Sequence, residues 1–271
     1  MSYNEFKQTF WSAHIQTELE KMCVLEEDCN KEFEGEVKYG SRVKILGVER
    51  PTIFDYTGDE IGAPEADKSN AQFLDINQAK AFNFKLDDID KAQSKPGLME
   101  ALTSEASLAL AEERDSYIAK TIALSNTLRS SSLKCETSAK CKTAIDSAFV
   151  ELWKNGVKIN GDVTIAISPV FYNLFKDKLT ELYTDNVDLI KKGIVGMYNG
   201  AKVKLTNNLY NDGTDDYIII RTKKAVAFAG QINDLEPYRP EKLFADALKG
   251  LDTFGCKVVR GKEVYVVKAH L

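Results

Sequence analysis

The two histidines are the first candidates for acid–base or nucleophilic chemistry. His14 and His270 lie near opposite ends of the 271 residues. A Ser-His-Asp or Cys-His arrangement would have to recruit one of them. We interpret both as surface residues, and we expect no catalytic residue in this protein.

Asp87, Asp88 and Asp90 form a tight carboxylate cluster. Their oxygens are the hard ligands that Ca²⁺ and Mg²⁺ prefer, but the spacing lacks the central Gly and the distant Glu of an EF-hand loop. We interpret the cluster as a solvated strand end. The charged run at residues 112–115 could supply an acid–base pair, and we interpret it as a solvated helix face that pairs across a subunit boundary.

The thiols and the spaced glycines give no cofactor or metal site either. Cys135 and Cys141 are six residues apart, which matches no common zinc spacing, and neither histidine is near them. The spaced glycines at 193–200 lie between strand-like pieces and are typical of turns, not of a phosphate-binding loop. With an odd number of cysteines in a long chain, we expect reduced thiols. The cysteines are Cys23, Cys29, Cys135, Cys141 and Cys256.

Composition indicates a globular protein of the cytoplasm. Hydrophobic residues make up 44% of the chain, charged residues make up 28%, and the net charge is -5. No apolar run approaches the ~20 residues that span a bilayer, and the N-terminus does not resemble a signal peptide. Acidic and basic residues are interspersed, so we expect neither membrane insertion nor sequence-specific nucleic-acid binding.

The N-terminal part predicts an arm followed by a protruding hairpin. Apolar residues from Phe10 to Met22 recur at roughly helical spacing, so this helix must cover apolar surface of its own or a neighbouring subunit. Residues 35–87 then predict a long β-hairpin: Val43 and Ile45 alternate with charged residues on the way out, and the pattern at 82–87 alternates on the way back. An isolated hairpin is only marginally stable in water. We therefore expect residues 1–32 and 55–75 to bury much of their apolar surface only in an assembly.

A long helix and an α/β unit follow. The apolar spacing from Pro96 to about Leu128 predicts a helix of roughly 45 Å, and a polar break at 129–140 separates it from the next unit. There, residues 144–152 predict a helix, and 163–167 predict a strand. Ser168 and Pro169 form an N-cap and N1 pair for a helix that reaches about Leu182.

The C-terminal half continues with strands. Two strand pieces flank Gly200, and buried strands are predicted at 217–220 and 225–229. A short helix is predicted around 243–248. A closing hairpin then turns near Arg260 and Gly261 and ends with a strand at 264–268.

The order of these elements resembles the major capsid proteins of tailed bacteriophages with the Hong Kong 97 type fold. The resemblance covers about residues 11–268, and its warrant is the order and spacing of several local stretches. These stretches are residues 84–93, 109–115, 167–172, 193–209, 227–240 and 254–258.

The resemblance implies an α+β fold and a structural function. The family fold has an N-terminal arm (1–34), an extended loop (35–87), a peripheral domain with a spine helix (88–130 and 231–255) and an axial domain (131–230 and 256–271). The implied partners are other copies in pentamers and hexamers, a portal, and double-stranded DNA that is enclosed without sequence-specific binding. The implied location is the virion, assembled in the cytoplasm of the bacterial host.

Two family features and two rival functions remain to be weighed. Some members of the family carry a long N-terminal scaffolding segment. Only some thirty residues precede the extended loop here, so we expect a separate scaffolding protein. Lys68 is the candidate lysine for a crosslink to a neighbouring asparagine, and we expect no such crosslink. The rivals are an encapsulin-like nanocompartment shell, which shares the fold, and a soluble enzyme that uses dispersed carboxylates.

Overall fold

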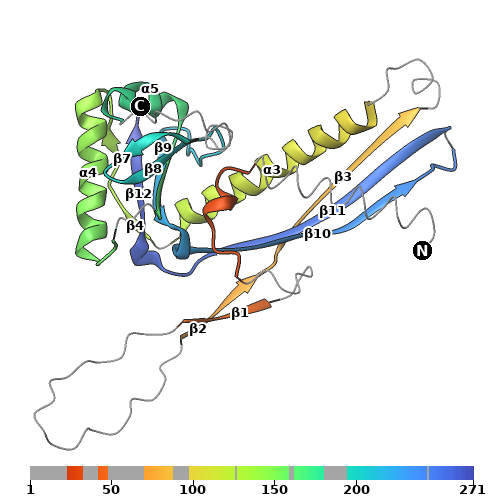
Figure 1. Ribbon diagram of the computed structural model, residues 1–271, viewed down its shortest axis with the longest axis horizontal. Helices are drawn as coiled ribbons and strands as arrows, with labels where there is room; N and C mark the ends of the chain where they lie inside the picture. Colours follow the sequence, from red (N-terminus) through yellow and green to blue (C-terminus); the bar gives the residue numbers. More distant parts are fainter. Residues whose placement is uncertain are drawn as a thin grey trace, which may run out of the picture.

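The structure has a compact body, a long arm and a projecting hairpin (Figure 1). It is a computed structural model, and it describes residues 23–32, 42–47, 70–87, 98–125, 127–158, 162–179, 194–242 and 244–271. No helix in these stretches is long and apolar enough to cross a membrane.

The body is built on a mixed sheet of seven strands among the described residues. In sheet order these are β4 (Leu128–Arg129), β12 (Val264–His270), β9 (Asp215–Thr222), β6 (Val163–Ile167), β8 (Ala201–Leu205) and β7 (Ile194–Tyr198), and β5 (Leu133–Lys134) also pairs with β12. β7 and β8 are joined by Asn199 and Gly200, which have φ values of 47° and 81°. Both values suit a tight hairpin turn, so Gly200 serves a turn as the sequence indicated.

Both faces of this sheet are buried, because alternate residues of its central strands point to opposite sides. On one side, Ile165 and Ile218 pack in a core with α4 (Ser138–Lys154) and α5 (Pro169–Phe175). On the other, Ala166 and Ile219 pack with the C-terminal half of the long helix. The hydroxyl of Ser168 accepts a hydrogen bond from the Phe171 N–H at 3.3 Å and caps α5, which confirms the predicted helix start.

The arm consists of one long helix on an antiparallel sheet (Figure 1). Its described strands are β10 (Val226–Tyr238), β11 (Ala245–Val258) and β3 (Gln78–Asp87), with β11 in the middle. Helix α3 (Leu98–Leu124) has 27 residues and is therefore about 40 Å long. Leu110 and Ala111 of α3 pack on Leu248, with Phe82 and Phe84 beside them.

The hairpin is formed by β1 (Arg42–Gly47) and β2 (Asn70–Asp75). At its base, Ile45 and Leu74 pack on Ala227 and Ala229 of β10, on the face that points away from α3. Gly255 makes this crossing possible, since a Cβ there would lie 2.4 Å from the carbonyl oxygen of Asp75. Short 3-10 turns complete the described elements: η1 (Glu26–Asp28), η2 (Lys176–Lys178), η3 (Lys223–Ala225) and η4 (Gly261–Glu263).

One strand predicted for the hairpin belongs to the arm instead. The returning strand of the 35–87 ribbon was expected to pair with the outgoing strand, but residues 78–87 form β3 and pair with β11 along its whole length. The alternating Phe82 and Phe84 need an apolar partner, and α3 provides one. The predicted ribbon is therefore wrong at its returning end, and the described hairpin pairs 42–47 with 70–75.

Three further expectations were wrong. The helix predicted around 243–248 is wrong, because residues 245–248 belong to the 14-residue strand β11, which pairs with strands on both sides. The long helix ends at Leu124, and the break after it contains β4 and β5, which pair in parallel with β12. The last two strands turn at η4 as predicted but do not pair with one another, since β12 pairs with β9.

Several expectations lie outside the described residues. These are the terminal helix at 10–22, the hairpin tip at 58–67 with Lys68, the predicted start of the long helix at Pro96, and the end of the helix predicted to reach Leu182.

Candidate functional site

The densest group of buried charges surrounds residues 23–32, which we call the anchor segment. This segment crosses the junction between arm and body. It forms hydrogen bonds with side chains from α3, β8 and β9. It also extends the arm sheet by a short parallel bridge: the N–H of Asn30 donates to Val226 O at 2.8 Å, and the N–H of Phe228 donates to Asn30 O at 3.1 Å.

Asp115 of α3 binds the backbone of the anchor segment. Its carboxylate accepts hydrogen bonds from the N–H groups of Val24 (2.8 Å), Leu25 (3.1 Å) and Glu26 (3.2 Å). The side chain is 1% exposed. Burial raises the pKa of Asp115 to about 6, although the three N–H donors favour the charged form and work against that rise.

Arg114, the neighbouring residue of α3, is the central cation. Its Nε and Nη2 donate to the two carboxylate oxygens of Asp252 at 2.7 and 2.5 Å, and its Nη1 donates to Glu26 Oε2 at 3.0 Å. The guanidinium also lies against the rings of Phe228 and Phe254. Burial disfavours the charge of Arg114, but Asp252 and Glu26 outweigh burial and raise its pKa above the ordinary value.

The remaining charges complete the neutralisation. Burial opposes the ionised form of Glu26, yet Arg114 and Lys31 prevail and lower the pKa of its carboxyl. Its other oxygen pairs with Lys31 at 2.7 Å. Arg114, Glu26, Asp252 and Lys31 therefore form a buried network in which each charge faces an opposite one.

Two more buried cations come from the body sheet. Arg221 of β9 donates to the carbonyl oxygens of Leu25 and Asp28 and contacts the sulfur of Cys29 at 3.2 Å. Lys204 of β8 donates to Val24 O at 3.2 Å. It also pairs with Glu27 at 3.1 Å and with Asp28 at 2.9 Å. The anchor segment is thus tied to the body as well as to the arm, so it fixes the two relative to one another.

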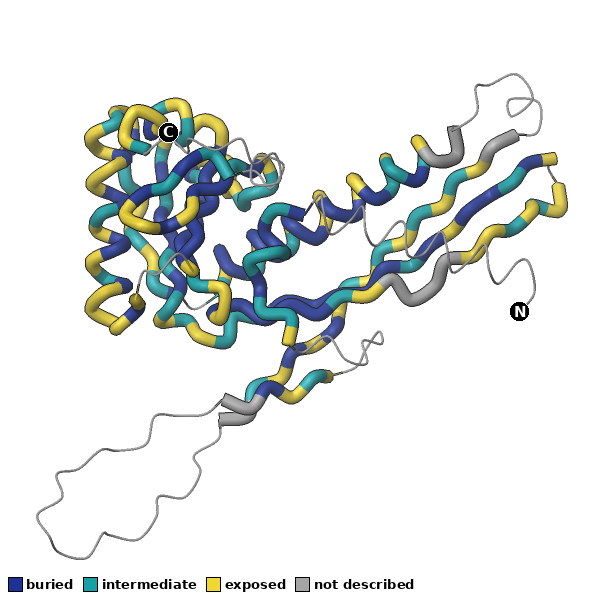
Figure 2. Tube along the Cα trace, viewed as in Figure 1, coloured by how far each residue is buried: buried dark blue, intermediate teal, exposed yellow. Residues whose placement is uncertain are grey.

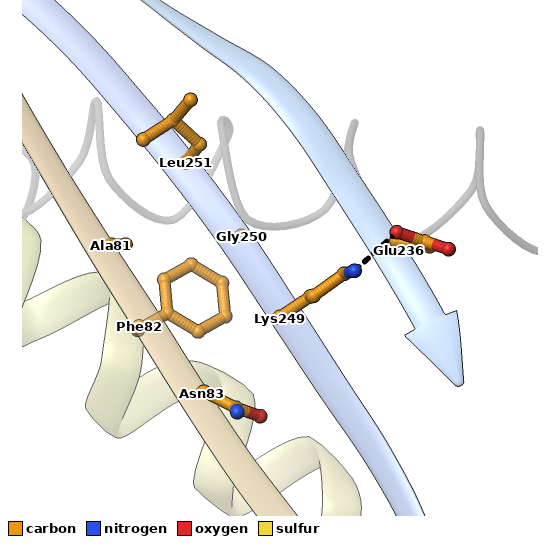
Figure 3. Close-up of a pocket in the computed structure, with 7 residues that line it drawn as sticks. All are labelled: Ala81, Phe82, Asn83, Glu236, Lys249, Gly250 and Leu251. Atoms are coloured by element: carbon orange, nitrogen blue, oxygen red, sulfur yellow. Dashed lines mark ion pairs between the residues drawn. The ribbon is translucent and has the colours of Figure 1, made fainter. Parts of the chain in front are cut away.

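A second feature is a shallow groove on the arm sheet (Figure 3). Its volume is about 820 Å³, and Lys249 of β11 reaches across one end to Glu236 of β10 at 2.6 Å. Its lining comes from all three arm strands: Ala81, Phe82, Asn83, Glu236, Lys249, Gly250 and Leu251. The groove is open and apolar in part, and its lysine is ion-paired with Glu236, so its chemistry suits contact with another surface.

The residues singled out from the sequence do not form one site. His14, Lys68, Asp88 and Asp90 lie outside the described residues, whereas Asp87 ends β3. The five cysteines are buried free thiols. Among the described residues, no group of three or more His, Cys, Asp or Glu side chains is placed to hold a metal ion.

His270 has a carboxylate neighbour but no nucleophile of its own. Its Nδ1 lies 3.4 Å from Asp215 Oδ1, and the hydroxyl of Ser132 donates to that same oxygen at 2.8 Å. Asp215 therefore stands between the serine and the histidine. A catalytic triad needs the histidine in the middle, so this contact is not one.

The prediction of a solvated helix face at 112–115 was correct for two of the four residues. Glu112 and Glu113 are exposed, as expected of a solvated helix face, but Arg114 and Asp115 are buried. Sequence reasoning also missed Lys204, Arg221 and Asp252. A usable signal existed for Arg221, which directly follows the apolar run at 218–220 of a strand, where only a paired charge can be buried. Lys204 gave no such signal, because it alternates with Val203 and Leu205 as an exposed strand residue would.

Comparison with solved structures shows a shared fold over nearly the whole chain. A chain of Mycobacterium phage Che8 matches with a TM-score of 0.70 and 27% identity, covering 90% of each chain. The capsid of the cyanophage P-SCSP1u matches with a TM-score of 0.68 and 17% identity, covering 91% of this chain and 88% of the other. A virus-like particle from Pyrococcus furiosus matches with a TM-score of 0.63 and 13% identity, covering 96% and 99%.

The predicted Hong Kong 97 type fold of phage capsid subunits is therefore confirmed. A scan against protein-family models and a search of the curated proteins give no match.

Replacing Arg114 tests the strength of the anchor. Arg114→Met leaves Asp252 buried without its counter-charge, so we expect the free energy of unfolding to fall by about 3–5 kcal/mol. The matched control is Glu113→Gln on the same helix, because Glu113 forms an exposed ion pair with Lys80 and such pairs contribute about 0–1 kcal/mol. Denaturant unfolding of both variants measures the difference. Equal losses of unfolding free energy would contradict a stabilising role of the buried Arg114 ion pairs. Adding Asp252→Leu to Arg114→Met should recover part of the loss.

Asp115 predicts a pH dependence with a defined sign. A carboxyl whose pKa rises from 3.8 to about 6 on folding binds more protons in the folded state between these values. Its contribution to stability therefore falls as the pH rises through this window, by at most about 1.4 kcal/mol per pH unit. Unfolding free energies of the wild type and of Asp115→Asn are to be compared across the window. The stability difference, wild type minus variant, should decrease with rising pH and then level off; an increase would mean that the N–H donors dominate.

Proposed function

We propose that this chain is the major capsid protein of a tailed bacteriophage, a structural subunit that self-assembles into the icosahedral shell around the phage DNA. The observation that carries the proposal is the match to a chain of Mycobacterium phage Che8, which covers 90% of both chains at 27% identity. At that breadth the likeness extends over most of the subunit and is not confined to one domain.

The projecting hairpin supports a role in assembly. Among its described residues, Ile45 and Leu74 pack on the arm, whereas Phe73 of β2 is 44% exposed. A two-stranded ribbon gains little stability by itself, and an exposed aromatic on such a ribbon is typical of an interface. We infer that a neighbouring copy covers this surface.

The parts of the chain receive roles by analogy with the family. We assign residues 1–34 to the N-terminal arm and the hairpin around 42–75 to the extended loop. The peripheral domain then comprises α3 with the three-stranded sheet, including β3, and the axial domain comprises the seven-stranded sheet with α4 and α5. In this assignment the boundaries near 230 and 255 fall inside the continuous strands β10 and β11.

The remaining proposals concern partners and location. The partners are other copies in pentamers and hexamers, a scaffolding protein, a portal, and enclosed double-stranded DNA. A net charge of -5 suits a shell that contains DNA without gripping it. The protein would act in the virion after assembly in the host cytoplasm. Its role is structural, and we propose no enzymatic activity.

Particle formation tests the proposal. The chain is to be expressed with and without its scaffolding protein and inspected by negative-stain electron microscopy. Closed particles of tens of nanometres are expected, whereas small discrete oligomers with an intact fold under both conditions would contradict the proposal. Particles that enclose a protein cargo instead of DNA would favour the encapsulin-like shell, whose fold would be the same.

Phe73 allows the interface to be weakened without unfolding the subunit. Phe73→Ser removes exposed apolar area, so the unfolding free energy of the isolated subunit should change by less than about 1 kcal/mol. Each lost contact of about 1.4 kcal/mol lowers an association constant tenfold, and the loss recurs in every subunit, so the particle yield should fall at least about tenfold. The matched control is Phe73→Leu, which keeps an apolar side chain and should assemble. Normal assembly of Phe73→Ser would show that β2 is not at an interface.

A further inference from the structure

The start of α4 rests on two neighbouring thiols. Cys135 lies three residues before the helix, and Cys141 is in its first turn. The thiol of Cys141 donates to the carbonyl oxygen of Cys135 at 3.4 Å, and the two sulfurs lie within hydrogen-bonding reach of one another. Both side chains are buried in the same core as α4 and α5.

This helix start lacks the usual caps. The N-cap residue Thr137 forms no side-chain hydrogen bond to the helix, and the first turn contains no acidic residue. The hydroxyl of Ser138 is buried without a hydrogen-bond partner. A side-chain cap typically contributes about 1 kcal/mol, and α5 has one at Ser168. The first turn of α4 is therefore more easily opened than that of α5.

Opening this turn would bring both thiols to solvent together. The pair lies one layer below the surface, since Glu136, Thr137, Ala139, Lys140 and Lys142 around it are all exposed. Burial raises the pKa of Cys135 to about 12, so the closed helix reacts slowly and the open one supplies the thiolate.

We propose that Cys135 and Cys141 form a reversible intramolecular disulfide when the chain meets a disulfide oxidant such as oxidised glutathione. The thiolate of one cysteine attacks a glutathione sulfur, which forms a mixed disulfide and releases one glutathione thiolate. The second cysteine then attacks the protein sulfur of that mixed disulfide and releases the other glutathione. Two protein thiols are oxidised, one glutathione disulfide is reduced to two thiols, and the two protons pass from protein to glutathione.

The disulfide would hold the start of α4 closed. Cys135 is held to the body sheet, because its N–H donates to His270 O at 2.8 Å and the preceding strand β5 pairs with β12. A bond to Cys141 would therefore tie α4 covalently to the sheet that it covers. The chemistry stands without the proposed function. If the chain is a capsid subunit, the disulfide would form once the particle has left the reducing cytoplasm, and this timing rests on the proposed function.

The other thiols have different surroundings, since Cys29 and Cys256 interact with one another but are buried together in the core under α3. Cys29 donates to Leu25 O and contacts Arg221, and Cys23 packs with Leu110 and Leu248. This leaves Cys135 and Cys141 as the pair for which the described residues provide both contact and a route to solvent.

Peptide mapping tests the proposal on the full chain, as particles or as purified subunits. The protein is incubated with oxidised glutathione at mildly alkaline pH, blocked with N-ethylmaleimide in denaturant and digested with trypsin. Cleavage after Lys134, Lys140 and Lys142 puts each cysteine on its own peptide. We expect these two peptides to be disulfide-linked, the free thiols to fall from five to three, and Tm to rise by about 5 °C. Dithiothreitol should reverse all three changes.

Two variants serve as controls. Cys141→Ala should abolish the linked peptide and the rise in Tm, whereas Cys23→Ala, which removes a buried thiol elsewhere, should keep both. Five alkylated thiols after incubation just below Tm, or a stable glutathione adduct on one cysteine only, would overturn the proposal. Particles are scored in the same samples. Particles without the bond would overturn the disulfide alone, and the bond without particles would support the disulfide and count against the shell.

Discussion

The buried guanidinium of Arg114 is the interaction on which the relative position of arm, body and N-terminal segment depends. A charge removed from water has to be paired, or it costs several kcal/mol. The partners of Arg114 are Glu26 and Asp252, which lie 88 and 138 residues away in the sequence. Because this pairing requires three distant segments to meet, it allows α3, β11 and the anchor segment only one arrangement.

Buried polar side chains also connect the anchor segment to the body. Asp115 binds the backbone of the anchor segment from the next position on α3, while Lys204 and Arg221 bind it from the body sheet. Figure 2 shows the resulting distribution of burial: the junction is densely buried, whereas exposed and intermediate residues are frequent on β3 and at the end of β10, far from the body. A subunit with a stiff junction can keep its core unchanged while its outer surfaces meet neighbours in different environments.

Local patterns were predicted well where local physics decides the outcome. The Ser168–Pro169 helix start, the Gly200 turn and the existence of the long helix follow from capping, turn conformation and apolar periodicity. The pattern at 82–87 was recognised as a strand but paired with the wrong partner, because alternation shows which face is apolar and not what covers it. Residues 243–248 were called helical from a short apolar pattern, which periodicity cannot distinguish from a strand.

The sequence by itself indicated the order of hairpin, long helix and α/β body, since each of these elements has its own capping, turn or periodic signal, and this order carried the resemblance to phage capsid proteins. It also indicated that familiar catalytic motifs are lacking. Only the tertiary structure decided that Arg114 and Asp115 are buried, while Glu112 and Glu113 beside them are exposed. Nor could the sequence show that Cys135 and Cys141 lie together at an uncapped helix start. The physical reason is that the burial of a charge or a thiol depends on partners far along the chain, and their approach is set by the whole fold.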